Sequence, residues 1–546
     1  MNQPDPTSAV EWNDAGAMLA QSGRLTEAIS AFRRAVAVAP AYPEAHNNLA
    51  NVYQMTGDLD RAVEGYQAAL RLRPQYAEAH RNLASALRRL GRLEESIEEL
   101  ATAVWLNPAY IEAAALLVHQ LQQLCDWRSL DRLTAQLIQA VENGSPGVNP
   151  FIFLTLETTP RQQRLCAEQW AARWAVAGRP PARPQRDRIT LGYLSADFQE
   201  HATAHLISEL IELHDRGRFR VIGYSYGTDD GSAARRRLRD AFDGFVDLEH
   251  ASHADAAARI RADEVDILVD LKGYTTDARP EILALRPAPI QVSYLGYPGT
   301  MGTPAIDYLI VDEFVVPADQ QPHFTEKLIH LPHCYQASDR TRLIAPTPTR
   351  ERCGLAEGAF VFCCFNSSYK LTPVMFDIWM RLLAHVPGSI LWLLGSSPTA
   401  NENLQREAEA RLTDGAQRLV FAPSLPNPLH LARFRVADLF LDTLPYNAHT
   451  LSSDALWGGC PVLTCAGETF ASRVAGSILR SAQLPELVTS TLGEYEAVAL
   501  RLASRRDELG ALRARLQQNR LALPLFDTPR FARDIEAAFE SMMKSP

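Results

Sequence analysis

A hydroxyl-rich stretch at positions 449–454 has the residue types that bind phosphate. It reads His-Thr-Leu-Ser-Ser-Asp and comes shortly after an apolar run that ends at Asp442. We predict that the run is a buried strand and that a helix opens at His449 after a Pro-Tyr-Asn turn. The first turn of a helix has unpaired backbone N–H groups and a partial positive charge, which suit a phosphate. A capped helix after a strand is common in α/β proteins, so a purely structural role is an equal alternative for this stretch alone.

Two sets of short apolar runs, separated by helix-like segments, include this stretch. The predicted strands of the first set are 189–196, 219–226, 265–271, 290–295 and 308–312, and those of the second set are 360–365, 390–395, 419–422, 439–442 and 462–465. Strands that alternate with helices indicate a parallel, doubly wound sheet. We therefore expect two Rossmann-like lobes with a ligand between the carboxyl ends of their strands.

Neither lobe has a common nucleotide fingerprint. No Gly-x-Gly-x-x-Gly follows the first strand of either lobe, and no Gly-Lys-Ser/Thr loop is present. These absences disfavour a dinucleotide redox enzyme and a P-loop nucleotidase. Two lobes with a phosphate-binding helix end favour a nucleotide-sugar transferase of the two-lobed type, although epimerases and phosphorylases also contain tandem Rossmann lobes.

An internal repeat of 34 residues precedes the lobes. The residues that keep this spacing are Pro40, Pro74 and Pro108, and also Gly23, Gly57 and Gly91. The period and the residue types are those of tetratricopeptide repeats (TPR). Because stacked repeats present a concave face to extended peptides, Asn48 and Asn82, at equivalent positions, are candidates for binding a peptide backbone. Solvated side chains or local helix contacts are the alternative.

These patterns divide the chain into four parts. They are residues 1–144 with about three repeats and a degenerate capping repeat, a helical connector at 145–187 with a Pro-rich boundary at 178–184, an N-terminal lobe at 188–345, and a C-terminal nucleotide-binding lobe at 346–546 that ends in an amphipathic helix. The predicted fold class is α plus α/β, a TPR superhelix followed by two Rossmann-like lobes.

The composition is that of an ordinary globular protein. The 546 residues are 47% hydrophobic and 22% charged, and the net charge of −10 argues against a general nucleic-acid binder. The eight cysteines have neither metal-ligand spacing nor a disulfide framework, which favours a reducing compartment. The first residues are too polar for a signal peptide, and no apolar run approaches the ~18 residues of a membrane span. We expect a cytoplasmic protein without a nucleic-acid or membrane partner.

Further motifs lie at the predicted strand ends. They are the segments Tyr193–Leu206 with Asp197, His201 and His205, Lys272–Thr275, Leu285–Gln291, Gly296–Thr300, Phe365–Lys370, His449–Asp454 and Gly467–Val474. After TPR repeats, these motifs resemble the protein O-linked N-acetylglucosamine (O-GlcNAc) transferase family, glycosyltransferase family 41, in a bacterial form. The resemblance covers nearly the whole chain. It implies a GT-B fold and inverting, metal-independent transfer of N-acetylglucosamine from UDP-GlcNAc to Ser or Thr of proteins, without a cofactor.

The resemblance also implies roles for single residues. Lys370 contacts the β-phosphate and stabilises the departing charge, and His449 and Thr450 receive the diphosphate. Asp454 accepts hydrogen bonds from the ribose. His201 is the candidate base, a role that is disputed in the family, where the histidine is alternatively a group that positions the substrate.

Other nucleotide-sugar contacts follow from the same resemblance. His430 and Arg433 match the segment that the family places against the uracil. The remaining contacts are Ser452, Ser453, Ser367, Tyr369, Gly296, Pro298 and Thr300. Ser367 stands where animal members have a glutamine near the nucleotide.

Two alternatives remain open at this point. A protein O-fucosyltransferase of the SPINDLY type has the same architecture and uses GDP-fucose, although Lys272–Thr275, Tyr369 and the segment 467–474 are closer to the N-acetylglucosamine branch. A catalytically idle TPR scaffold is the other, and the presence of His201, Lys370 and Asp454 together argues against it. The sequence names neither the acceptor proteins nor the oligomeric state.

Overall fold

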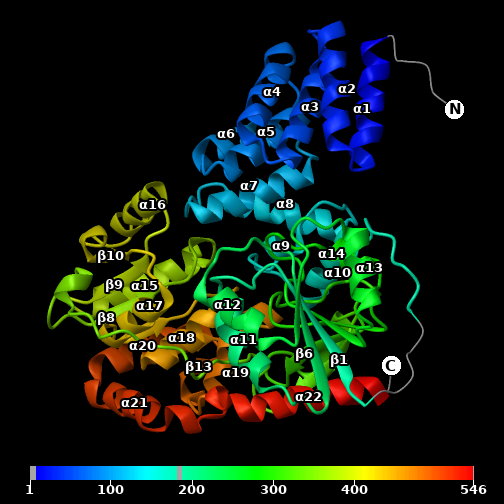
Figure 1. Cartoon of the computed structure of the whole chain (residues 1–546). Helices are drawn as coiled ribbons and strands as arrows, with labels where there is room; N and C mark the ends of the chain where they lie inside the picture. Colours follow the sequence, from blue (N-terminus) through cyan, green and yellow to red (C-terminus); the bar gives the residue numbers. More distant parts are fainter. Residues whose placement is uncertain (1–7, 181–186, 545–546) are drawn as a thin grey trace. The chain divides into compact units, whose positions relative to one another are not determined.

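Figure 1 shows the computed structural model, which describes residues 8–180 and 187–544. The first residues of the chain and positions 181–186 of the predicted connector lie outside the described residues. The chain divides into two compact units, one of residues 1–121 and 129–137 and one of residues 122–128 and 138–546.

The first unit is built from paired helices, as the 34-residue period predicts. The helices are α1 (Ala9–Gln21), α2 (Leu25–Val38), α3 (Pro43–Met55), α4 (Leu59–Leu72), α5 (Ala77–Arg89), α6 (Leu93–Leu106), α7 (Ile111–Gln123) and α8 (Leu130–Glu142). Gly23, Gly57 and Gly91 have φ angles of 76°, 83° and 78° in the turns within each pair. Glycine suits this left-handed region. Cys125, which replaces the glycine in the degenerate fourth pair, keeps a positive φ of 50°.

The N-terminal lobe contains a seven-stranded parallel sheet in the order β3-β2-β1-β4-β5-β6-β7. Its strands are β1 (Ile189–Ser195), β2 (Phe219–Ser225), β3 (Gly244–Asp247), β4 (Ile267–Asp270), β5 (Ile290–Ser293), β6 (Tyr308–Asp312) and β7 (Lys327–Leu331). Its helices are α11 (Ala202–Leu213), α12 (Ala233–Ala241), α13 (His253–Ala262) and α14 (Pro280–Ala284). This strand order is the Rossmann order extended by one strand.

The C-terminal lobe contains a six-stranded parallel sheet in the order β10-β9-β8-β11-β12-β13. Its strands are β8 (Val361–Cys364), β9 (Ile390–Leu394), β10 (Leu419–Ala422), β11 (Leu439–Leu441), β12 (Val462–Cys465) and β13 (Val488–Thr489). Its helices are α15 (Pro373–His385), α16 (Pro398–Glu409), α17 (Asn427–Arg433), α18 (Thr450–Gly458), α19 (Val474–Ser481), α20 (Leu492–Ser504), α21 (Arg506–Asn519) and α22 (Thr528–Lys544).

Three strands escaped the sequence prediction, and all lie at sheet edges. β3 begins with a glycine and has no fully buried residue, and β13 has only two residues. β7 includes the exposed Lys327 and a half-buried histidine. An edge strand buries less apolar surface than a central one, so its sequence lacks the continuous apolar run that marks a buried strand.

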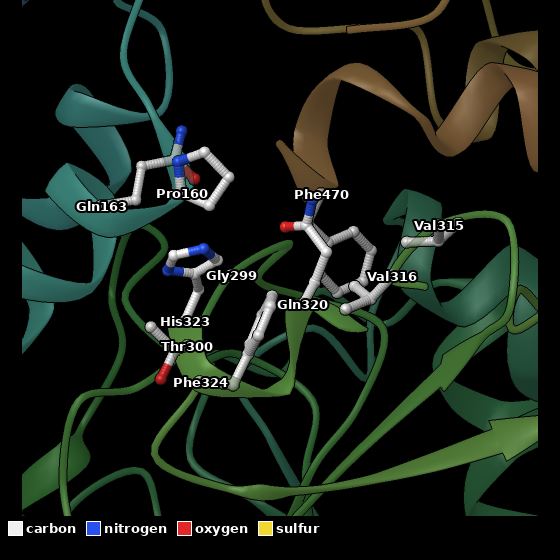
Figure 2. A pocket seen from close by; sticks show the side chains of 10 residues that line it. All are labelled: Pro160, Gln163, Gly299, Thr300, Val315, Val316, Gln320, His323, Phe324 and Phe470. Atoms are coloured by element: carbon white, nitrogen blue, oxygen red, sulfur yellow. The ribbon is translucent and has the colours of Figure 1, made fainter. Parts of the chain in front are cut away.

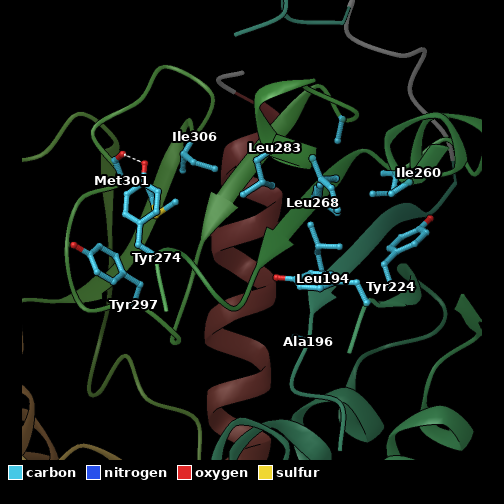
Figure 3. Packing of buried hydrophobic residues seen from close by; sticks show 14 of the residues in the cluster. Leu194, Ala196, Tyr224, Ile260, Leu268, Tyr274, Leu283, Tyr297, Met301 and Ile306 are labelled. Carbon is cyan, nitrogen blue, oxygen red and sulfur yellow. Dashed lines mark hydrogen bonds between the residues drawn. The ribbon is translucent and has the colours of Figure 1, made fainter. Parts of the chain in front are cut away.

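The connector contacts both lobes, through Phe151 beside Tyr446 of the C-terminal lobe and through Trp174 on the N-terminal lobe. It contains α9 (Pro150–Phe153) and α10 (Pro160–Ala171). After α10, the Trp174 side chain stacks on Tyr274 with ring centroids 6.2 Å apart. Tyr274 in turn donates a hydrogen bond of 2.6 Å to the Met301 carbonyl, which is drawn as a dashed line in Figure 3.

One buried hydrophobic cluster of this unit extends from one lobe to the other. Figure 3 shows Leu194, Tyr224 and Leu268 in the N-terminal sheet and Tyr297 in the loop after β5. The same buried cluster includes Tyr446 and Ala471 from the C-terminal lobe. The loops after the strands of the two lobes are therefore packed together.

The last helix, α22, returns to the N-terminal lobe, where it packs against α11 and β7. Glu536 accepts hydrogen bonds from His214 Nδ1 at 3.1 Å and from the Asp215 backbone N–H at 2.8 Å. Phe539 is fully buried beside the His214 ring. The predicted amphipathic terminal helix is present, and its apolar side lies on the first lobe.

Candidate functional site

The turn that leads into α18 is shaped by one buried carboxylate. Asp442, directly after β11, accepts hydrogen bonds from the backbone N–H groups of Thr443 (2.8 Å) and Ala448 (2.6 Å) and from the Thr464 hydroxyl (2.6 Å). Burial raises the pKa of Asp442 to about 6, and these hydrogen bonds oppose the shift. The carboxylate therefore holds the chain in the conformation that starts the helix.

The N-terminus of α18 is free of side-chain capping. His449 occupies the N-cap position, and its side chain makes no capping hydrogen bond. Its Nε2 lies 3.2 Å from the Ala471 carbonyl, and its ring lies 4.9 Å from that of Tyr446. The Ser452 N–H already donates to the His449 carbonyl at 3.0 Å, so the N–H groups that can face an anion are those of Thr450 and Leu451.

Ser452 and Ser453 do not present their hydroxyls openly. Both residues are fully buried. Ser452 donates to the Ala448 carbonyl and Ser453 to the Thr450 carbonyl, each at 2.8 Å. Their hydroxyls shape the first turn of the helix, and their direct contact with a nucleotide sugar stays a prediction.

Lys370 brings a cation to the same turn. It ends a short 3-10 helix after β8, and its Nζ donates to the Asn447 carbonyl at 2.8 Å. The Nζ also lies 4.0 Å from the centroid of the Tyr446 ring. Burial lowers the pKa of Lys370 to about 8, while nearby Asp442 opposes that shift. An ammonium group has three N–H donors, so two remain for an anion beside the α18 terminus.

Ser367 and Tyr369, which precede Lys370 by three residues and one residue, differ in exposure. Ser367 is exposed. Tyr369 is half-buried, and its ring packs edge-on against Phe151 and Tyr446 with centroids 6.0 and 6.2 Å away. Tyr369 thus supports the ring beside the Lys370 ammonium. The predicted contacts of Ser367 and Tyr369 with the nucleotide sugar remain predictions.

A second polar group forms around Asp454, on the second turn of α18. Asp454 makes an ion pair with Arg342, from the segment that joins the two lobes, and both side chains are almost fully buried. Asp454 Oδ2 lies 3.8 Å from His430 Nε2. Burial raises the pKa of Asp454, and Arg342 opposes this shift. Arg342 is a site residue that the sequence did not reveal.

His430 is neutral in this environment. Its Nδ1 accepts a hydrogen bond from Arg433, so its hydrogen is on Nε2. Burial, together with Arg433 and Arg342, lowers the pKa of His430 to about 3. Among the described residues, His430 Nε2 and Arg342 Nη2 are both buried without a hydrogen-bond partner. Two such unpaired donors beside a carboxylate suit a polar ligand with oxygen acceptors and hydroxyl donors.

The Arg433 side chain is buried and donates a hydrogen bond to His430. It is 2% exposed, and its guanidinium also donates to the Pro423 carbonyl at 2.8 Å and lies 4.0 Å from the Phe365 ring centroid. Burial lowers the pKa of Arg433 to about 10. Its predicted contact with a uracil stays a prediction.

The N-terminal lobe contributes His201 at the start of α11. His201 Nδ1 accepts a hydrogen bond of 3.1 Å from the Thr203 N–H and thereby caps this helix. The same nitrogen lies 3.5 Å from Asp197 Oδ2, and the side chain is 44% exposed. His205, one turn later, pairs with Glu200 at 2.9 Å.

The Gly296–Thr300 turn approaches the C-terminal lobe. A Cβ atom on Gly296 would lie 1.9 Å from the Leu271 carbonyl oxygen, so only glycine fits. Pro298 follows the buried Tyr297, which belongs to the core cluster that also contains Tyr446. Thr300 donates its hydroxyl to the buried Glu326 at 2.6 Å.

A small pocket opens beside this turn, as Figure 2 shows. It encloses about 290 Å³, including the part open to solvent. Its lining comes from α10, the Gly299–Thr300 turn, the segment 315–324 and Phe470 of the C-terminal lobe. Figure 2 shows His323 and Phe324 on one side of the pocket and Phe470 facing them.

In the first unit, Asn48 and Asn82 form hydrogen bonds between repeats. Asn48 Nδ2 donates to Asn13 at 3.0 Å, and Asn82 Nδ2 donates to Asn47 at 3.1 Å. Both side chains are half-buried. The inter-repeat contacts use one amide hydrogen of each residue, and their predicted binding of a peptide backbone is untested.

Two kinds of feature are absent from residues 8–180 and 187–544, a cluster of metal ligands and a helix that could cross a membrane. No three His, Cys, Asp or Glu side chains within residues 8–180 and 187–544 come together in a way that would hold a metal ion. Over the same ranges, every helix is too short or too polar to cross a membrane.

Comparison with known proteins follows the division of the chain. A model of glycosyl transferase family 41 matches residues 159–346 and 340–535, and two models of TPR repeats match residues 16–57 and 47–114. A solved structure of a Thermobaculum terrenum O-GlcNAc transferase mutant aligns with 100% of this chain and 98% of that chain, with a TM-score of 0.72 and 29% identity. The predicted fold class is confirmed.

Curated plant proteins are similar over the same region. The chain is 35% identical to the probable UDP-N-acetylglucosamine–peptide N-acetylglucosaminyltransferase SEC of Arabidopsis thaliana over an alignment of 452 residues. This alignment covers 78% of this chain and 46% of that protein. It is 33% identical to the probable UDP-N-acetylglucosamine–peptide N-acetylglucosaminyltransferase SPINDLY of Hordeum vulgare over an alignment of 365 residues. This alignment covers 65% of this chain and 38% of that protein. The chain thus spans less than half the length of these two relatives. With its TPR repeats and two Rossmann-like lobes, the chain belongs to glycosyl transferase family 41.

Proposed function

We propose that this protein is a protein glycosyltransferase that transfers N-acetylglucosamine from UDP-GlcNAc to Ser or Thr hydroxyls of acceptor proteins. The observation that carries the proposal is the pairing of the Lys370 ammonium with the uncapped N-terminus of α18. Both groups favour negative charge, because the Lys370 ammonium, which comes from the segment after β8, donates to the Asn447 carbonyl of the turn that Asp442 shapes and that starts α18. A diphosphate is the part of a nucleotide sugar that fits there.

The leaving group is stabilised by this pair. When the bond between the sugar and the β-phosphate breaks, charge grows on the diphosphate, and a fixed cation with a helix terminus lowers the energy of that state. These groups do the work for which other transferases use a metal ion. The proposed reaction is therefore metal-independent, with no cofactor beyond the donor.

The nucleoside is placed by the polar group around Asp454. Asp454 Oδ2 accepts a ribose hydroxyl while Oδ1 stays with Arg342. The unpaired donors His430 Nε2 and Arg342 Nη2 face oxygen atoms of the nucleoside. In this arrangement Arg433 fixes the tautomer of His430 through its hydrogen bond to Nδ1.

The acceptor meets the sugar from the N-terminal lobe. Attack from the face opposite the diphosphate inverts the configuration at the anomeric carbon, so the acceptor hydroxyl lies on the side of His201 and the Gly296–Thr300 turn. The TPR unit binds the acceptor polypeptide through Asn48 and Asn82. The names of SEC and of the Thermobaculum terrenum protein support this donor and reaction, and the level of identity leaves the donor to be tested.

Calorimetric titration of UDP and GDP tests the proposal. We expect UDP to bind the full chain more tightly than GDP, because the two nucleotides share the diphosphate and differ only in the base, which lies on the side of His430 in the proposed arrangement. Lys370→Ala should weaken UDP binding about tenfold or more, because charge-assisted hydrogen bonds contribute about 1.5–3 kcal/mol. Lys327→Ala, at an exposed lysine of the other lobe, should not change UDP binding.

Each alternative has its own outcome in this titration. Preferential GDP binding would favour the GDP-fucose reaction of the SPINDLY type. Failure of both nucleotides to bind would overturn the transferase proposal and favour a TPR scaffold. If UDP binds, incubation with UDP-GlcNAc and a candidate acceptor protein, followed by mass spectrometry, identifies the transferred sugar.

A further inference from the structure

A buried lysine beside His201 has no assigned role. Asp197 follows β1, and Lys272 follows β4, which pairs with β1 in parallel register from Leu191↔Ile267 to Leu194↔Asp270. The carboxyl ends of the two strands therefore bring these side chains together. Lys272 Nζ donates to both carboxylate oxygens of Asp197, at 2.9 and 3.0 Å.

The ion pair lies almost fully out of water. The Lys272 and Asp197 side chains are 6% and 8% exposed. Asp270 fixes the loop that holds the lysine, because its carboxylate accepts the backbone N–H groups of Lys272 (3.2 Å) and Gly273 (2.8 Å). A buried ion pair contributes little net stability compared with apolar residues of the same size. The pair instead acts on the charge that Asp197 presents to His201, the nearest titratable side chain of α11's N-terminus.

His201 is the neighbour that this pair controls. Its Nδ1 is 3.1 Å from the Thr203 backbone N–H and 3.5 Å from Asp197 Oδ2. A nitrogen that accepts the Thr203 N–H carries no hydrogen, so a neutral imidazole in this geometry is protonated on Nε2. Two arrangements thus compete, with Nδ1 either accepting from Thr203 or donating to Asp197.

We propose that Lys272 is a positioning residue that holds His201 in the Nε2–H tautomer by binding both carboxylate oxygens of Asp197. With its charge matched by Lys272, Asp197 is a weak acceptor for an Nδ1 hydrogen, and Nδ1 accepts from Thr203. His201 then offers a hydrogen-bond donor to the substrate at Nε2. In the opposite arrangement, Nδ1–H bonds a carboxylate and Nε2 is free to accept a proton, as in hydrolase triads.

The other charged groups near His201 either lower its pKa, as Lys272 does, or are hydrogen-bonded to partners of their own. His205, on the same helix, lowers the pKa of His201, and it is hydrogen-bonded to Glu200. Asp230 accepts the Glu200 backbone N–H at 2.8 Å from the loop before α12. Partial burial and Lys272 also lower the pKa of His201, and Asp197 opposes them. His201 is thus neutral at neutral pH, where its tautomer decides its chemistry.

The tautomer is measured by ¹⁵N NMR of the full chain with labelled histidines. His201→Gln identifies the signals of His201 among the 14 histidines. We expect the wild-type protein to show a protonated Nε2 and an unprotonated Nδ1. A protonated Nδ1 in the neutral wild-type imidazole would overturn the proposal without any further variant.

Variants of Lys272 separate its charge from its volume. Lys272→Met should move the hydrogen to Nδ1 and raise the pKa of His201 by about one unit, because Asp197 loses its cation. Lys272→Arg should keep the wild-type tautomer. The double variant Lys272→Met, Asp197→Asn should return the hydrogen to Nε2, because no carboxylate then competes for it. An unchanged tautomer in Lys272→Met would contradict the proposal.

Two further readouts guard against trivial outcomes. Lys272→Met leaves a buried carboxylate unpaired, so its folding is checked by circular dichroism. If it does not fold, Lys272→Gln, which removes the charge and keeps a polar side chain, is measured in its place, and an unchanged tautomer there would equally contradict the proposal. The role of His201 in the reaction rests on the proposed function, whereas the tautomer does not. In kinetics, Lys272→Met should lower kcat about 10–100-fold with little change in the donor KM. Absence of transfer by the wild type would contradict the proposed function alone.

Discussion

At the scale of single residues, the site depends on charges that are kept partly out of water. Lys370 is the clearest case, because burial lowers its pKa to about 8 from an ordinary value near 10.5. The lysine is charged at neutral pH but close to losing its proton. A bound diphosphate favours the charged form and therefore raises this pKa again.

Because the pKa of Lys370 lies close to neutral pH, we predict that UDP binding above pH 8 is coupled to the uptake of a proton by Lys370. Below pH 8 the ammonium is already charged, and binding leaves its protonation unchanged. As the pH rises through about 8, the free protein loses the proton and must take it up on binding, so the affinity falls. Titrations in buffers of different ionisation enthalpy measure this uptake. The Lys370→Arg variant, whose guanidinium stays charged, should show no uptake; the same uptake in that variant would assign it to another group.

Arg342 predicts a second effect at this scale. Arg342→Met leaves Asp454 buried without its cation, which raises the pKa of that carboxyl further and favours its protonated form. We expect UDP affinity to fall about tenfold at neutral pH and to recover partly at higher pH, where Asp454 ionises. Calorimetry between pH 6 and pH 9 tests this. Arg340→Met is the control, since Arg340 pairs with Glu209 instead; an equal loss of affinity there would reject the assignment.

The sequence predicted the residues that stand at strand ends and missed their partners. Lys370 and His201 follow predicted strands, and the family resemblance assigned their expected roles. Arg342 was missed because it is distant from Asp454 along the chain and stands in a segment without periodicity. Lys272 was noted only as part of a motif, since its pairing with Asp197 becomes visible only when β1 and β4 are adjacent.

At the scale of elements, two turns hold the site in place. One is the turn from Asp442 to α18, and the other is the Gly296–Thr300 turn. The strands and helices around them were predictable, because buried parallel strands are continuous apolar runs. The edge strands β3, β7 and β13 were not predictable, because they are short or partly exposed and lack a continuous apolar run. The conformation of the turns depends on buried hydrogen bonds that no local pattern encodes.

Asp442 predicts how strongly its turn is held. Asp442→Ala removes the acceptor for the Thr443 and Ala448 N–H groups and for the Thr464 hydroxyl. Since each buried donor left unpaired costs about 1–3 kcal/mol, we expect the free energy of unfolding to fall by about 2–4 kcal/mol and UDP binding to weaken. Urea unfolding monitored by tryptophan fluorescence measures the stability. A loss below about 1 kcal/mol would show that the turn holds itself without the carboxylate.

Gly296 offers a matched test of close packing. Gly296→Ala places a Cβ 1.9 Å from the Leu271 carbonyl oxygen, so the turn must move and the protein should be destabilised by about 1–3 kcal/mol. Gly510→Ala, in the interior of α21, meets nothing within 4 Å and should stabilise the protein by about 0.5–1 kcal/mol. Thermal unfolding of both variants gives the comparison, and equal shifts of Tm would contradict it.

At the scale of the whole molecule, the proposed function assigns acceptor binding to the repeats and donor binding to the lobes. The Asn48→Ala, Asn82→Ala double variant should reduce glycosylation of a protein acceptor about tenfold and leave UDP binding unchanged, because these residues lie in the TPR unit. Mass spectrometry of the acceptor and calorimetry with UDP give the two readouts. Unchanged glycosylation would limit the two asparagines to contacts between repeats.

The return of α22 also has a mechanical consequence. The polypeptide crosses between the lobes once near residues 336–342 and again just before Thr528. The two crossings touch, because the Thr528 hydroxyl donates to the Ser338 carbonyl at 2.6 Å. The lobes are therefore joined by two chain segments that meet at one point, in addition to the buried cluster that contains Tyr297 and Tyr446. A protease cut before Thr528 would leave the segment 336–342 as the single covalent link between the two lobes.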